Sequence, residues 1–133
     1  AGQIDKLASI FSKDIVFQII TPISFKLCTD TVSIVREEAS RKISSLLDNL
    51  YDEEEYKQFL IVNITSYSQA PRFVTRQAFV YMCSSLMDNP KRFKEHFLEY
   101  FVALATDKVP NVRILVAKVL YEKYTLGNVL FED

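Results

Sequence analysis

Apolar residues recur along this chain at helical spacing, in runs separated by short polar turns. The last run has a one-sided apolar face, made up of Val112, Leu115, Val116, Val119 and Leu120. Pro110 opens it, where proline is tolerated because its missing N–H has no partner inside a helix. Two earlier runs repeat this pattern, and their arginines, Arg36, Arg76 and Arg113, recur at intervals of 40 and 37 residues. Such a period is typical of stacked helical hairpins.

The N-terminal half of the pattern predicts three helices. The first begins with Asp14 as its cap and has a kink near residues 18–21, because Pro22 removes a backbone hydrogen bond. The second runs from about residue 33 to residue 50, with its apolar face on Ala39, Ile43, Leu46, Leu47 and Leu50. The third begins with a capping box of Asp52 and Glu55. Its apolar stripe consists of Tyr56, Phe59, Leu60, Asn63, Ile64 and Tyr67.

The C-terminal half predicts three more helices. Pro71 is expected at the first position of a helix that ends near Met87. Asn89 caps the next helix and Pro90 begins it; its apolar positions are Phe93, Phe97, Tyr100, Phe101 and Leu104. The helices then form three antiparallel pairs, at about 14–50, 52–87 and 89–125. A single pair cannot bury its apolar face alone, so we expect an all-α solenoid stabilised by contacts between neighbouring pairs.

Composition is consistent with a folded helical chain. Among 133 residues, 49% are hydrophobic and 25% charged, and only 2 Gly and 4 Pro are available for turns. The net charge of −1 gives no general reason to expect nucleic acid or an anionic membrane as a partner. Cys28 and Cys83 lie in apolar runs and are expected to be buried, reduced thiols, which suits the cytoplasm or nucleus. Neither end shows a polar capping helix, so the chain is expected to be a fragment of a longer solenoid.

Two segments carry a recognisable signature. Residues 30–36 (DTVSIVR) and 107–113 (DKVPNVR) resemble the D-x-x-x-x-V-R motif of HEAT repeats. Residues 73–86 and 111–118 are similar to C-terminal repeats of the scaffold subunit of type-2A protein phosphatases and of the related regulatory subunit 1 of protein phosphatase 4. The resemblance extends from Ile19 to Tyr124. In the middle repeat, Ser68 and Gln69 stand where the turn aspartate is expected.

The chemistry of this motif can be argued from the residues themselves. A carboxylate at the end of a turn can accept hydrogen bonds from the free N–H groups that open the following helix, and an arginine of the adjacent repeat can reach it with a planar donor fork. We expect such a ladder to fix the register between repeats. Its members are Asp30, Arg36, Arg76, Asp107 and Arg113, which we interpret as structural first and functional second.

The resemblance implies a function. In these scaffold subunits the turns within the repeats line up along one ridge that carries the catalytic phosphatase subunit. The corresponding turns are 29–33, 69–73 and 107–111, and the candidate partner-binding residues are Asp30, Thr31, Arg72, Phe73, Lys108 and Asn111. The sequence therefore predicts a non-catalytic scaffold in the cytoplasm or nucleus, which presents turns and a concave helix face to a protein partner and needs no cofactor.

Catalytic and metal sites find little support in the sequence. His96 has no catalytic partner at a suitable offset, and adjacent carboxylates such as Glu53, Glu54 and Glu55 diverge around a helix. The basic C-terminal third, with Tyr121 and Tyr124, leaves one alternative open, because some HEAT-like proteins are nucleic-acid-binding proteins or DNA glycosylases. Other HEAT adaptors, of nuclear transport or chromosome organisation, are further alternatives.

Overall fold

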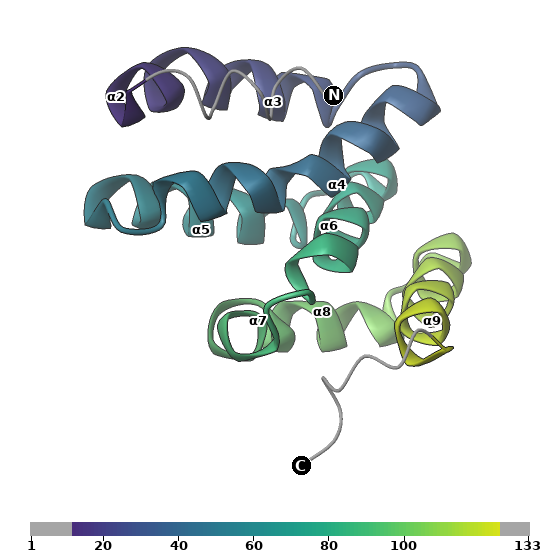
Figure 1. Ribbon diagram of the computed structural model, residues 1–133. Helices are drawn as coiled ribbons and strands as arrows, with labels where there is room; N and C mark the ends of the chain where they lie inside the picture. The colour runs from purple at the N-terminus through teal and green to yellow at the C-terminus, as the bar shows by residue number, and fades with distance from the viewer. Residues whose placement is uncertain (1–11, 126–133) are drawn as a thin grey trace.

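A computed structural model describes residues 12–125, which fold into helices joined by short turns (Figure 1). The first helical stretch consists of α2 (Lys13–Ile15), the π-helical turn η1 (Val16–Ile20) and α3 (Thr21–Leu27). Then follow α4 (Ser33–Leu50), α5 (Glu54–Tyr67), α6 (Phe73–Leu86), α7 (Pro90–His96), α8 (Leu98–Ala103), the 3₁₀ turn η2 (Leu104–Thr106) and α9 (Pro110–Thr125). No helix in this part of the chain is long and apolar enough to cross a membrane.

The helices alternate between two layers. The first layer contains α3, α5 and the α7–α8–η2 stretch, and the second contains α4, α6 and α9. Within the second layer α4 packs on α6, and α6 packs on α9. Between the layers α3 contacts α4, α5 contacts α6, and the α8–η2 stretch contacts α9. Stacking of successive helix pairs (Figure 1) confirms the predicted all-α solenoid, whereas the number of HEAT repeats and their bounds at 14–50, 52–87 and 89–125 stay predictions.

One continuous apolar core runs through both layers. Its largest fully buried side chains are Phe79, Phe93, Phe97, Phe101, Ile43, Leu47, Leu50, Leu60, Ile64, Met82 and Met87. Burial of each contributes about 1.5 to 3 kcal/mol relative to exposure. The apolar face predicted for α4 is buried, and so is that of α9 except for the half-buried Leu120. In α5 the prediction was wrong for Phe59, which is 50% exposed and packs edge-on against Phe17 at the outer surface.

Two predicted helix caps were wrong. The first helix begins after Ser12, whose hydroxyl oxygen accepts from the N–H of Ile15 at 3.4 Å, and Asp14 instead accepts a hydrogen bond from the Tyr56 hydroxyl. The expected capping box of Asp52 and Glu55 does not form, since α5 begins one residue later than expected. Its cap is Glu53, which makes no side-chain capping bond, and Asp52 is paired with Lys13.

Proline was predicted to open three of the helices, and this is right for two of them. Pro90 and Pro110 are first helical residues, as predicted, and the Asn89 side chain accepts from the N–H of Arg92 at 3.2 Å. Pro71 lies two residues before α6, because its backbone belongs to the turn and its carbonyl accepts from an arginine side chain.

Two helical stretches are interrupted. The disturbance predicted near residues 18–21 takes the form of η1, in which the N–H of Thr21 reaches the carbonyl of Val16 immediately before Pro22. A second interruption, between α7 and α8, was not predicted. There Phe97 has a φ of −126°, yet its N–H still bonds to Phe93 and its side chain is fully buried.

Candidate partner-binding ridge

The turns from the first to the second layer lie on one side of the molecule. They are residues 28–32 between α3 and α4, 68–72 between α5 and α6, and 107–109 between η2 and α9. The first and last of these connections are visible on the right-hand side of Figure 1. We call these turns, together with the first turns of α4, α6 and α9, the turn ridge.

Each turn of the ridge is closed by an arginine from the following helix. The guanidinium Nη1 donates to backbone carbonyls that precede it in the chain. These bonds run from Arg36 to Asp30 (2.9 Å) and Thr31 (3.1 Å), from Arg76 to Ala70 (2.9 Å) and Pro71 (3.1 Å), and from Arg113 to Asp107 (2.6 Å). Every turn therefore has the same register relative to its arginine.

This register corrects the sequence alignment of the middle turn. Asp30 and Asp107 each lie six residues before an arginine, and the residue six before Arg76 is Ala70. The missing aspartate is therefore replaced by Ala70. The prediction that Ser68 and Gln69 stand there was wrong by one or two residues, because the reach of the arginine fixes the position.

The two aspartates form Asx turns immediately before the second-layer helices. Oδ1 of Asp30 accepts from the N–H of Val32 at 2.8 Å, and Oδ1 of Asp107 accepts from the N–H of Val109 at 2.8 Å. These bonds satisfy backbone donors of the turns, two residues after each aspartate. Ala70 has no oxygen with which to do the same.

Arg76 and Asp107 also join two turns. The Arg76 Nε donates to Oδ2 at 2.7 Å and its Nη2 donates to Oδ1 at 3.0 Å, in a two-point contact whose side chains are only 8% and 7% exposed. The Arg76 hydrogen bonds, with that from the Val109 N–H, lower the pKa of the Asp107 carboxyl, although desolvation acts in the opposite direction. Arg36 forms no salt bridge with any residue of 12–125, since the position facing it carries Ala70.

Most candidate contact residues lie at the surface. Thr31, Arg72, Phe73, Lys108 and Asn111 are exposed, whereas Asp30 is half-buried. The carboxylates of the ridge are thus used inside the fold, and the freely presented groups are a hydroxyl, two cations, an aromatic ring and an amide. Contact of these residues with a partner stays a prediction.

Three apolar residues of the ridge were missed by the sequence analysis. Val32, Ile34 and Ile114 are 51%, 61% and 63% exposed on or just before the first turns of α4 and α9. The signal that could have found them is periodicity, because Ile34 and Ile114 are large apolar residues that fall outside the buried faces of their helices.

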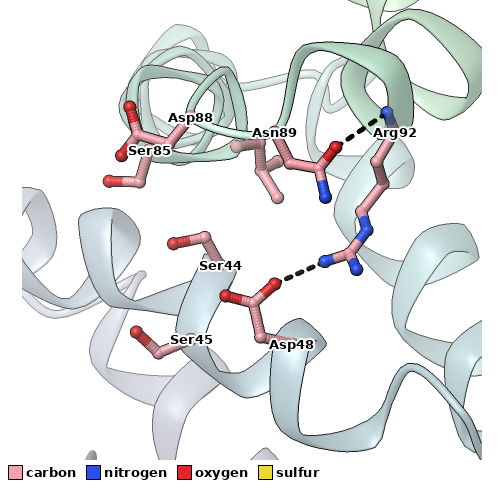
Figure 2. A pocket seen from close by; sticks show the side chains of 8 residues that line it. Ser44, Ser45, Asp48, Ser85, Asp88, Asn89 and Arg92 are labelled. Carbon is pink, nitrogen blue, oxygen red and sulfur yellow. Dashed lines mark hydrogen bonds and ion pairs between the residues drawn. The ribbon is translucent and has the colours of Figure 1, made fainter.

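A polar hollow lies between the second-layer helices. Ser44, Ser45 and Asp48 of α4 face Ser85, Asp88 and Asn89 at the end of α6, and Arg92 bridges to Asp48 (Figure 2). The cavity measures about 300 Å³ and continues into a neighbouring hollow. Over both hollows the charged lining residues cancel: Glu38, Asp48 and Asp88 against Arg41, Lys42 and Arg92.

Groups that could have supported catalysis are engaged in packing. Cys28 and Cys83 are buried free thiols, as predicted, and burial raises the pKa of Cys28 to about 11. The Nε2 of His96 lies 2.9 Å from the hydroxyl of Tyr51 in a half-buried contact. Residues 12–125 contain no group of three His, Cys, Asp or Glu side chains that could hold a metal ion.

Comparison with known proteins supports the sequence resemblance. Over 127 residues, which cover 90% of this chain, it is 30% identical to the serine/threonine-protein phosphatase 4 regulatory subunit 1 of Mus musculus and 31% identical to that of Homo sapiens. The chain resembles regulatory subunit 1 of protein phosphatase 4. It spans about 13% of the length of these relatives. The chain matches no protein-family model, and no solved structure matches it.

The resemblance predicted from the repeat motifs is therefore confirmed. Phosphatase 4 regulatory subunit 1 is named as a regulatory and not a catalytic subunit, which agrees with the expected non-enzymatic role. The matched region includes the segments that form the turn ridge, because it takes in nine-tenths of the chain.

Proposed function

We propose that this chain is part of a non-catalytic scaffold that binds the catalytic subunit of a type-2A-like Ser/Thr phosphatase through the turn ridge. The observation that carries the proposal is the similarity to phosphatase 4 regulatory subunit 1 over 90% of the chain. The scaffold supplies position and effective concentration, while the bound subunit supplies the chemistry.

The ridge supports this proposal physically. Its backbone is held by arginine–carbonyl bonds in every turn and by the buried contact of Arg76 with Asp107, so exposed side chains are presented from a fixed frame. Arg72 and Phe73 lie at its centre, and arginine and aromatic residues are frequent among side chains that dominate binding energy. A location in the cytoplasm or nucleus stays a prediction.

The test is capture of purified phosphatase 4 catalytic subunit by the chain. The double substitution Arg72→Glu with Lys108→Glu is expected to lower capture at least tenfold, because two exposed cations of the ridge are reversed. Lys91→Glu with Lys94→Glu is the matched control, since both lysines are exposed on α7 and the charge change is the same.

Circular dichroism of all three proteins separates binding from folding. Equal helicity with selective loss of capture in the ridge variant supports the proposal. Failure of the unsubstituted chain to capture the subunit, or equal loss in both variants, contradicts it.

A further inference from the structure

Charge is segregated between the two edges of the solenoid. Residues 26–36, 66–76 and 103–113, which surround the turn ridge, contain six lysines and arginines but only two acidic residues. At the opposite ends of the helices, residues 48–58 and 86–96 contain seven acidic residues and four lysines and arginines. The near-neutral total of −1 for the chain conceals this difference.

The structure increases the contrast, because the two ridge carboxylates are turned inward. Asp107 is bound by Arg76 and is only 7% exposed, and Asp30 caps the N–H of Val32. By contrast, Lys26, Arg72 and Lys108 are exposed and form no salt bridge with any residue of 12–125. These three cations are therefore presented without an ion pair at the ridge surface.

Helix dipoles add no net potential at the ridge, because α4, α6 and α9 begin there while α3, α5 and η2 end there. At the opposite edge several acidic residues are paired: Asp52 with Lys13, Asp48 with Arg92 and Asp88 with Lys123. The remaining exposed groups at that edge carry both signs, since Lys91 and Lys94 are exposed there as well as Glu53 and Glu55. On the ridge, by contrast, the exposed charged groups without a salt bridge to any residue of 12–125 are cations.

We infer that the turn ridge docks an acidic protein surface, in which carboxylates face the cations of the ridge and apolar groups face its exposed aliphatic side chains. Charge complementarity gives the acidic character, and Val32 and Ile34 in the first turn, with Ile114 in the last, give the apolar contacts. The similarity to phosphatase 4 regulatory subunit 1 favours a protein over a nucleic acid as the owner of these carboxylates. The inference rests on the proposed function in taking the ridge as the docking surface, and it adds the chemistry of the partner.

The first experiment measures the association rate constant of the chain with purified phosphatase 4 catalytic subunit between about 0.05 and about 0.5 M NaCl. The rate constant is expected to fall about tenfold or more over this range, because electrostatic steering is screened. In Arg72→Glu with Lys108→Glu it should be low at every salt concentration. Lys91→Glu with Lys94→Glu should behave like the unsubstituted chain.

A second experiment removes the phosphatase from the test. A labelled peptide of about ten glutamates is expected to bind the unsubstituted chain and the α7 control at low salt, and to bind the ridge variant at least tenfold more weakly. A duplex DNA of similar charge serves as the competing anion. Peptide binding that is equal in all three proteins, or DNA binding tighter than peptide binding at the ridge, would overturn the inference.

The two experiments distinguish the failure of each idea. Binding of the catalytic subunit at a rate that responds neither to salt nor to ridge reversal would leave the proposed function standing and overturn the acidic partner. Binding of the glutamate peptide to the ridge without any binding of the catalytic subunit would overturn the proposed function and leave the acidic partner standing.

Discussion

The middle and last turns of the ridge have the same backbone arrangement but different chemistry. In both, the arginine of the following helix closes the turn through carbonyl oxygens. The last turn adds Asp107, which accepts from the N–H of Val109 just before α9 and receives Arg76 from the neighbouring turn. The middle turn has Ala70 at the equivalent place, so it lacks this side-chain bond and Arg36 lacks a carboxylate partner.

This difference separates two roles that the HEAT signature combines. The arginine is sufficient to hold the turn, because the middle turn keeps its form without an aspartate. The aspartate contributes a bond to the backbone of its own turn and, in Asp107, the connection to the preceding turn. The stack should therefore be more rigidly held between its second and third turns than between its first and second.

Removal of Asp107 should have the largest effect. Asp107→Ala leaves the guanidinium of Arg76 nearly buried without its charged partner, and breaking a buried pair in this way typically costs about 3 to 5 kcal/mol. Urea unfolding followed by circular dichroism measures the loss. Asp30→Ala is the control, because it removes only the bond to the N–H of Val32 and should cost about 1 kcal/mol. Equal losses in the two variants would show that the cross-turn contact adds nothing.

Acid should weaken the contact between the second and third turns. The pKa of Asp107 is lowered in the folded protein, chiefly by the hydrogen bonds from Arg76. A lowered pKa stabilises the fold above the unfolded value of about 3.9 and this stabilisation disappears as the pH falls through the folded value. The free energy of unfolding should therefore decline below about pH 4 more steeply in the unsubstituted chain than in Asp107→Asn. Parallel pH profiles would contradict this assignment.

Helical periodicity was enough to predict most of the fold. The ends of α4, the starts of α7 and α9, and nearly all of the buried faces follow from apolar spacing and from proline and asparagine at helix starts. The predictions failed where tertiary contacts decide. The sequence predicts Asp14 and Asp52 as caps of the helices that follow them, but their side chains bind Tyr56 and Lys13, about 40 residues away in the chain.

The candidate site was predictable in outline only. The recurring arginines located the turns, and counting six residues back from Arg76 gives Ala70 as the position equivalent to the aspartate, which the bond to its carbonyl confirms. Exposure of Ile34 and Ile114 depends on how each helix is rotated against its neighbours, which spacing within one helix indicates only weakly. Charge segregation could be counted from sequence, but the inward orientation of Asp107 could not.

Restoring the missing aspartate in the middle turn should have the smallest effect on stability. In Ala70→Asp the new carboxylate should accept from the N–H of Arg72, as Asp30 accepts from the N–H of Val32 and Asp107 from that of Val109. Arg36 lies close enough to respond, because it lines the same hollow as Val74 in the first turn of α6. We expect a gain of about 1 kcal/mol in the free energy of unfolding.

A double-mutant cycle then divides this gain between its two sources. Combining Ala70→Asp with Arg36→Gln removes the new ion pair but keeps the bond to the N–H of Arg72, so the difference between the two backgrounds measures the pair alone. A coupling of about 0.5 kcal/mol or more would show that the ladder can be extended to the contact between the first and second turns. No coupling, with the gain retained in both backgrounds, would mean that the aspartate acts only within its own turn and that the connection between repeats needs the nearly complete burial seen for Arg76 and Asp107.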